Sequence, residues 1–162
     1  GVEALRDRFN FPGMKILQFA FGGERNNSFL PHTYNKNAVV YTGTHDNETT
    51  LGWYLNAAED ERDHLRRYMA SSGRDIVWDL IRLAYASTAD MAVIPMQDLF
   101  VLGNEARMNY PGREGGWWGW RYTREMFTAR AAGVAMGLAE LARTYGRAPE
   151  EVMTPVTPEI AS

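Results

Sequence analysis

Two ionisable side chains, His45 and Asp46, directly follow an apolar run in the stretch VVYTGTHDNETTLGW (residues 39–53). Residues 38–41 are all apolar, which is typical of a strand buried on both faces, because an exposed face would alternate with polar residues. Residues 47–49 then supply the cap and acidic first turn of a helix. These features predict one βα unit of an α/β protein, a class in which ligands bind at the carboxyl ends of the strands.

The same residues also have a purely structural interpretation. Asp46 or Asn47 could act only as a helix cap, and His45 only as a hydrogen-bonded loop histidine. On spacing alone the structural interpretation is favoured, because helix caps far outnumber catalytic sites.

The composition restricts the class of protein. A length of 162 residues fits one medium domain with a sizeable core. The formal net charge of −3 predicts neither nucleic-acid nor membrane-surface binding, and the lack of cysteine excludes disulfides and thiolate metal sites. We find no apolar run near the roughly 18 residues of a membrane span and no signal peptide, so we expect a cytoplasmic protein. Because the chain starts at Gly1 within a helical pattern, we expect a fragment or a processed piece.

Alternating strand and helix patterns follow one another along the chain. Strands are predicted at residues 14–21 and 38–41, and from residue 91 to a stop or bulge at Pro95, which cannot donate to a ladder. Helical spacing is found at residues 2–9, 51–69, 75–87 and 123–145. Long polar loops occupy residues 22–37 and 103–119. Strands with intervening helices favour parallel βαβ connectivity.

Longer strings of residues resemble a known family. They are FPGMKILQFAFGG (residues 11–23), FLPHTYNKNAVVYTGTHDNETTLGWY (residues 29–54), and RMNYPG followed by WGWR (residues 107–112 and 118–121). In this order they resemble the 4-α-glucanotransferases, the amylomaltase or disproportionating-enzyme family of glycoside hydrolases. The resemblance implies a (β/α)8 TIM barrel, which needs about 250 residues and eight strands. We therefore expect residues 1–147 to form the C-terminal part of the barrel, about strands 6 to 8 with their helices, and residues 148–162 to form a tail.

The resemblance also implies a reaction. Members of the family transfer an α-1,4-glucan segment between maltodextrins by a retaining mechanism that uses three acidic residues. Asp46 matches the third of these, which stabilises the transition state, because hydrogen bonds from sugar hydroxyls to a carboxylate strengthen as the ring becomes positive. The nucleophile and the acid/base are expected upstream of Gly1. The chain would then be inactive alone and would need the missing N-terminal part of its own barrel, but no metal and no cofactor.

Four residues are predicted to bind substrate: His45, Asn47, Asn109 and His32. His45 can donate a hydrogen bond to a sugar hydroxyl whether it is neutral or charged. Asn109, within RMNYPG, could contact sugar hydroxyls or only form a turn. His32 could line the cleft or only bond the backbone of its loop.

Three tryptophans near the last helix could stack on sugar rings or pack in the core: Trp117, Trp118 and Trp120. The family usually shows the pattern GNWxWR here, and Trp117 takes the place of its Asn. A polar contact at position 117 is therefore not carried over.

Two other functions fit part of the pattern. A non-catalytic glucan-binding module would use the aromatic and polar loops for recognition alone, although a three-stranded sheet with unpaired edges argues against stable binding. An α-amylase-type hydrolase shares a His-Asp pair at the seventh strand. Products would separate these cases, because transfer yields longer as well as shorter oligomers.

Overall fold

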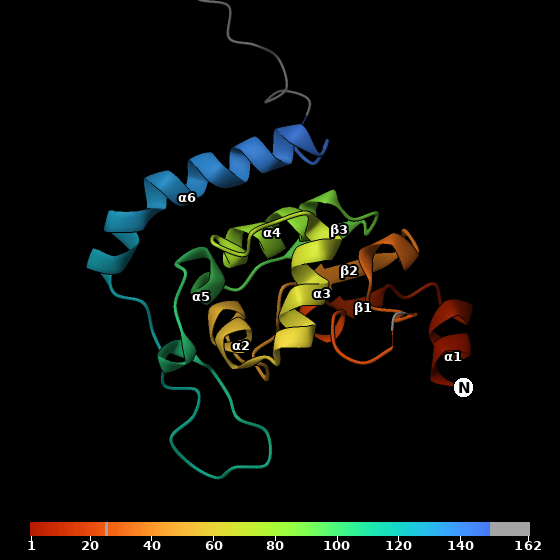
Figure 1. Cartoon of the computed structure of the whole chain (residues 1–162), viewed down its shortest axis with the longest axis horizontal. Coiled ribbons are helices and arrows are strands. Elements are labelled where there is room, and N and C mark those ends of the chain that lie inside the picture. The colour runs from red at the N-terminus through yellow and green to blue at the C-terminus, as the bar shows by residue number, and fades with distance from the viewer. Residues whose placement is uncertain (25, 150–162) are drawn as a thin grey trace, which may run out of the picture.

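A three-stranded parallel sheet lies at the centre of the computed structural model, which describes residues 1–24 and 26–149 (Figure 1). The strands are β1 (Gly13–Ile16), β2 (Ala38–Tyr41) and β3 (Met91–Val93), in that order across the sheet. The predicted α/β class and parallel connectivity are confirmed. Since all three strands run the same way, their carboxyl ends share one edge of the sheet.

Helices follow each strand. They are α1 (Val2–Arg8), α2 (Thr50–Asn56), α3 (Glu59–Met69), α4 (Ile76–Ala86), α5 (Met96–Leu99) and α6 (Arg124–Thr144), with 3-10 turns η1 (Leu17–Phe19), η2 (Pro31–Thr33) and η3 (Asn104–Ala106). Figure 1 shows α1 and α6 at opposite ends of the molecule. Within residues 1–24 and 26–149, no helix combines the length and apolarity that crossing a membrane requires.

The hydrophobic core lies on the helix-covered face of the sheet. Val40 of β2, Leu65 of α3 and Leu80 of α4 are completely buried there, in one cluster with Leu141 of α6. Burial of a leucine side chain contributes about 1.5–3 kcal/mol, so these contacts fix the helices on the sheet.

The other face of the sheet is apolar but open. The register places Met14 of β1 beside Val39 of β2, and Val39 beside Met91 of β3. The exposed fractions are 58% for Met14 and 56% for Met91. The prediction of strands buried on both faces is therefore wrong for the described residues, because their helices cover one face alone.

Several predicted element boundaries also shift. β1 ends at Ile16, and η1 follows, because the chain turns there to bury Leu17 and Gln18. The predicted helix 51–69 is two helices, since Ala57 and Ala58 are both extended. As predicted, β3 ends before Pro95, which precedes α5.

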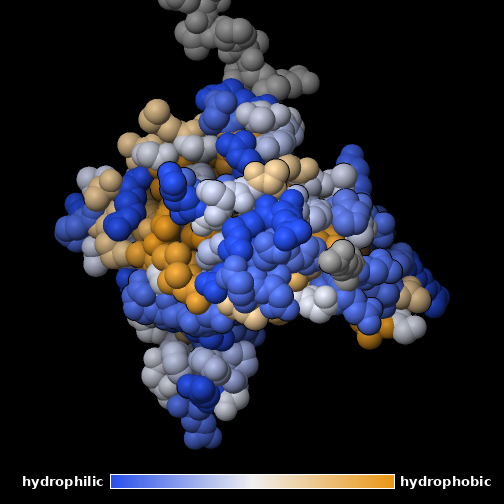
Figure 2. All heavy atoms as spheres, in the orientation of Figure 1, coloured by the Kyte–Doolittle hydropathy of each residue, from blue (hydrophilic) through white to orange (hydrophobic). Residues whose placement is uncertain are grey.

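The last helix forms where predicted but packs mainly through its C-terminal end. Among its residues Leu141 is buried, whereas Phe127 is 46% exposed. Figure 2 shows apolar side chains gathered below α6, where a hollow of about 620 Å³ separates it from α4 and α5. The guanidinium of Arg147 holds the end of α6 by donating to the carbonyls of Tyr85, Ser87 and Ala89. Residues 150–162 of the predicted tail lie outside the described residues.

Candidate functional site

The loop that carries His45 and Asp46 joins the carboxyl end of β2 to α2. The N-cap of α2 is Thr49, whose side chain accepts a hydrogen bond from Gly52 N at 3.1 Å. The prediction that residues 47–49 supply the cap is therefore confirmed at Thr49, and the alternative in which Asp46 or Asn47 is the cap is wrong. The predicted acidic first turn is also wrong, because Glu48 precedes the cap.

The buried carboxylate of Asp98 accepts hydrogen bonds from residues at both ends of this loop. Asp98, which is 1% exposed, accepts hydrogen bonds from Thr42 Oγ1 at 2.5 Å, Thr50 N at 2.8 Å and Thr50 Oγ1 at 2.7 Å. Burial raises the pKa of Asp98, and the three hydrogen bonds oppose that rise. Thr42 follows β2 and Thr50 opens α2, so Asp98 fixes the distance that the loop must span.

A tight turn within the loop directs His45 and Asp46 outward. The side-chain oxygen of Asn47 accepts hydrogen bonds from Thr44 N at 3.0 Å and from Thr44 Oγ1 at 2.6 Å. The side chains of His45 and Asp46 are 57% and 48% exposed. The turn thus presents a carboxylate to solvent at the ligand-binding edge of the sheet.

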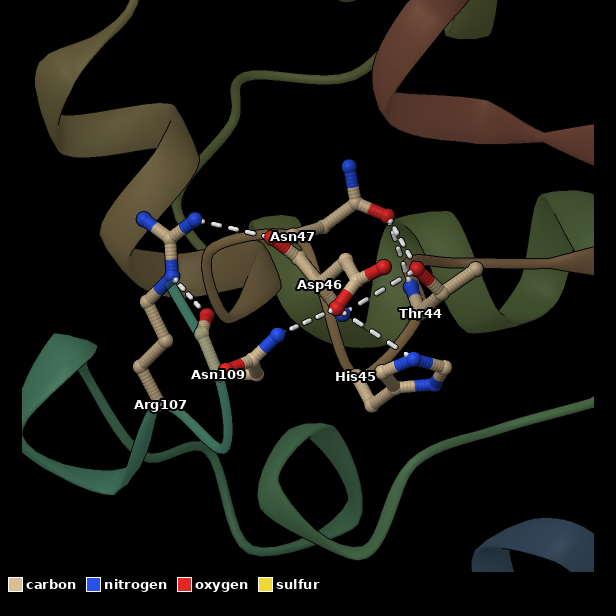
Figure 3. Close-up of polar contacts among 6 residues, drawn as sticks. All are labelled: Thr44, His45, Asp46, Asn47, Arg107 and Asn109. Atoms are coloured by element: carbon tan, nitrogen blue, oxygen red, sulfur yellow. Dashed lines mark hydrogen bonds and ion pairs between the residues drawn. The ribbon is translucent and has the colours of Figure 1, made fainter. Parts of the chain in front are cut away.

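Asn109 reaches this carboxylate from the loop after β3 (Figure 3). Its Nδ2 donates to Asp46 Oδ1 at 2.7 Å, and its backbone N donates to His45 O at 3.0 Å. His45 Nε2 lies 3.2 Å from the same Oδ1. Within residues 1–24 and 26–149, no hydrogen-bond donor reaches Oδ2, so this oxygen is free to accept a hydrogen bond from a ligand.

The position of His45 bears on its proton. A carboxylate oxygen only accepts hydrogen bonds, so a hydrogen bond between His45 Nε2 and Asp46 Oδ1, which lie 3.2 Å apart, requires the proton on Nε2. With Nε2 engaged in this way, Nδ1 is left for a ligand, as an acceptor in the neutral ring and as a donor in the protonated ring.

Arg107 was not predicted from the sequence, although it opens the RMNYPG string. Its Nη2 donates to Asp46 O and its Nε to Asn109 O, both at 2.8 Å. The guanidinium also lies 4.2 Å from the centre of the Tyr110 ring. Arg107 thus joins the two loops that form the site.

Trp118 packs against His45, with 5.0 Å between the ring centres. Its backbone N donates to Met108 O at 2.8 Å, and its φ of +65° is in the left-handed region. The ring is 52% exposed. Neither Trp117 nor Trp120 is buried in the core, and Trp117 lies beside Tyr110.

His32 is not brought together with the other predicted residues. It lies in η2, where its ring Nδ1 is 3.1 Å from Tyr68 Oη and its backbone N donates to the same oxygen at 3.3 Å. Tyr68 belongs to α3, so His32 packs on that helix.

A cavity of about 120 Å³ lies beneath the loop, between His45, Asn47 and Arg107. Pockets that hold small molecules are usually larger, about 300–1,000 Å³, so this cavity is too small to enclose one. Within residues 1–24 and 26–149, no three His, Cys, Asp or Glu side chains are arranged to hold a metal ion.

Known proteins are similar to this chain in sequence and fold. The 4-alpha-glucanotransferase of Synechocystis sp. is 50% identical over 148 residues, which are 90% of this chain and 29% of that protein. The 4-alpha-glucanotransferase of Thermus thermophilus is 54% identical over 128 residues, covering 74% and 26% of the two chains. The structure of the amylomaltase from Streptococcus agalactiae in complex with acarbose matches with a TM-score of 0.85 and 33% identity, over 91% of this chain and 30% of that one.

The chain therefore spans between 26% and 30% of the length of these relatives. The family match itself extends over residues 1–127 and so includes the whole loop of His45 and Asp46, together with Arg107 and Asn109. On this match, the chain belongs to the 4-alpha-glucanotransferase family.

Proposed function

We propose that the whole protein transfers α-1,4-glucan segments between maltodextrins by a retaining mechanism, and that this chain carries one of its three catalytic carboxylates, Asp46. The observation that carries the proposal is the geometry of that carboxylate. It is exposed at the carboxyl edge of a parallel sheet, with Oδ1 accepting a hydrogen bond from Asn109 Nδ2 and lying 3.2 Å from His45 Nε2, and with Oδ2 free of any donor from the described residues. Family membership supplies the class of reaction.

Asp46 acts in this proposal as the stabiliser of the transition state. A retaining mechanism needs a nucleophilic carboxylate and an acid/base about 5 Å apart, and Asp46 is neither. Its Oδ2 accepts hydrogen bonds from the 2- and 3-hydroxyls of the sugar before the cleaved bond. Those bonds strengthen as positive charge develops on the ring, so the transition state is stabilised more than the bound substrate.

The fold proposal places the three strands as the sixth, seventh and eighth of a (β/α)8 barrel, with residues 1–147 as its C-terminal portion and residues 148–162 as a tail. The row of Met14, Val39 and Met91 supports it, because all-parallel sheets are normally covered on both apolar faces. The nucleophile and the acid/base would come from the remaining part of the barrel. We therefore expect the isolated chain to be inactive.

The proposed substrate contacts are His45 through Nδ1, Asn47 through its amide nitrogen and Asn109 through its amide oxygen. We keep His32 as a proposed contact outside this cluster. Maltodextrins are the expected ligands, and acarbose, which is bound in the related amylomaltase, is expected to bind here as well. A cytoplasmic location, without nucleic-acid or membrane partners, remains part of the proposal.

Replacement of Asp46 by Asn in the whole protein tests the assignment. Asn keeps the shape of the side chain but removes the negative charge. We expect kcat for the disproportionation of maltotriose to fall by about 100-fold or more, with a much smaller change in KM. The assay follows the formation of longer and shorter oligomers by chromatography.

Asp63→Asn is the matched control, because Asp63 is a half-exposed aspartate on α3 that pairs with Arg67. This variant should keep wild-type turnover. Near-normal turnover of Asp46→Asn would refute the role of Asp46. Products that are all shorter than the substrate would indicate a hydrolase, and transfer by the isolated chain would contradict the need for further carboxylates.

A further inference from the structure

Arg107 forms two hydrogen bonds whose acceptors belong to different loops. Asp46 O comes from the loop after β2, and Asn109 O comes from the loop after β3. Both acceptors are backbone carbonyls, so the two hydrogen bonds fix the backbone of both loops and not only their side chains. Both loops carry residues of the proposed site.

The guanidinium group suits this task. Its N–H donors lie in one rigid plane, so Nε and Nη2 can reach two carbonyl oxygens at once, each at 2.8 Å here. A lysine ammonium is a point charge on a flexible stem and lacks this fixed pair. Replacement of Arg107 by Lys therefore keeps the charge but loses the bridge.

The bridge determines where the amide of Asn109 lies. Arg107 and the bond from Asn109 N to His45 O fix the backbone of Asn109 on both sides. This places Asn109 Nδ2 2.7 Å from Asp46 Oδ1. Since the terminal torsion of an aspartate is broad, this donor restricts the rotation of the carboxylate.

We propose that Arg107 is a positioning residue for Asp46: it bridges the two loops so that the Asn109 amide holds Oδ1 and leaves Oδ2 for the sugar hydroxyls. Arg107 does not touch the substrate in this proposal. The inference rests on the proposed role of Asp46.

Arg113 provides a matched control. Its guanidinium lies 3.7 Å from the centre of the Tyr110 ring, and that of Arg107 lies 4.2 Å from it. The two arginines thus share one aromatic partner. The hydrogen bonds to Asp46 and Asn109 come from Arg107.

The experiment compares Arg107→Lys with Arg113→Lys in the whole protein. A misplacement of about 1 Å can cost about 100-fold in rate, so we expect Arg107→Lys to lower kcat for maltotriose disproportionation by about 10- to 100-fold. KM should change by less than about threefold, because the lost interaction acts in the transition state. Arg113→Lys should match the wild type. Equal kcat values for the two variants would overturn the proposal.

Thermal unfolding of each variant shows whether a loss of activity reflects misfolding. Arg107→Gln, which keeps one donor, replaces Arg107→Lys if the lysine variant unfolds at a lower temperature than Arg113→Lys. A folded Arg107→Gln with wild-type kcat would also overturn the proposal.

A double-mutant cycle tests whether Arg107 acts through Asn109. If it does, Arg107→Lys should cause little further loss in an Asn109→Ala protein, because the amide that it positions is gone. Fully additive losses would show that Arg107 acts by another route. The Asp46→Asn variant separates the two proposals. If this variant is active, the proposed role of Asp46 fails. If it is inactive while Arg107→Lys has normal kcat, only the positioning role of Arg107 fails.

Discussion

Asp46 and Asp98 have the same side chain in opposite environments. Asp46 is half exposed, and among the described residues Asn109 and His45 contact Oδ1 alone, which leaves Oδ2 free to accept a hydrogen bond. Asp98 is 1% exposed, and its two oxygens accept three hydrogen bonds from Thr42 and Thr50. Asp46 can therefore meet a ligand, whereas Asp98 can only hold the loop that presents it.

The pH dependence of stability should reveal Asp98. Burial raises its pKa above the ordinary value of 3.8, so between these two values the folded state binds the proton more tightly than the unfolded state. The contribution of Asp98 to the free energy of unfolding must then fall as the pH rises through that window, and level off above it. Asp98→Asn cannot titrate. Urea unfolding of both proteins at a series of pH values should show the stability of the wild type, relative to Asp98→Asn, decreasing with pH, and an increase would contradict the assignment.

The sequence predicts His45, Asp46 and Asn109, because the strings around them resemble a family with a known site. Arg107 and Asp98 were missed for a physical reason. Arg107 acts on a residue 61 positions away, and Asp98 on residues 56 and 48 positions away, so no local pattern carries their roles. The cap lies within the predicted residues 47–49, at Thr49, and the alternative of a cap at Asp46 or Asn47 fails because α2 begins after Thr49.

At the level of elements, the close approach of α2 to η3 depends on Gly52. A Cβ atom at this position would collide with the side chain of Asn104. That side chain donates to Glu48 Oε1 at 2.6 Å, so it cannot move without breaking a hydrogen bond. The helical pattern of residues 51–69 did not reveal this contact, because periodicity shows which face of a helix is apolar and not how closely a neighbour approaches.

Replacement of Gly52 by Ala tests this packing. Overpacking costs about 1–3 kcal/mol, which we expect to exceed the better helix propensity of Ala. Gly133 on α6 is the matched control, because a Cβ there meets nothing within 4 Å. Gly133→Ala should stabilise the protein by about 0.5–1 kcal/mol. Chemical unfolding of both variants measures the two effects, and stabilisation by both would show that Asn104 moves aside freely.

At the level of the whole molecule, one face of the sheet, with the row of Met14, Val39 and Met91, is not covered by the described helices. The strand pattern predicts apolar residues on both faces of the sheet. Both faces of the sheet do carry apolar side chains, but the described helices cover one face. A sequence pattern gives the polarity of a surface without saying what covers it. The same holds for α6, whose Met136 is 73% exposed although its helix formed as predicted.

Two lysine substitutions distinguish a covered sheet face from a solvent-exposed one in the whole protein. Met91 on β3 is 56% exposed and Met136 on α6 is 73% exposed, so both positions accept a lysine in the described chain. If a closed barrel covers the row of Met14, Val39 and Met91, Met91→Lys buries a charge and should lower the free energy of unfolding by roughly 2–5 kcal/mol. Met136→Lys, on an outer helix, should change it by less than about 0.5 kcal/mol. Unfolding in urea measures both effects, and equal small effects would mean that the sheet face stays open to water and that the strands do not belong to a closed barrel.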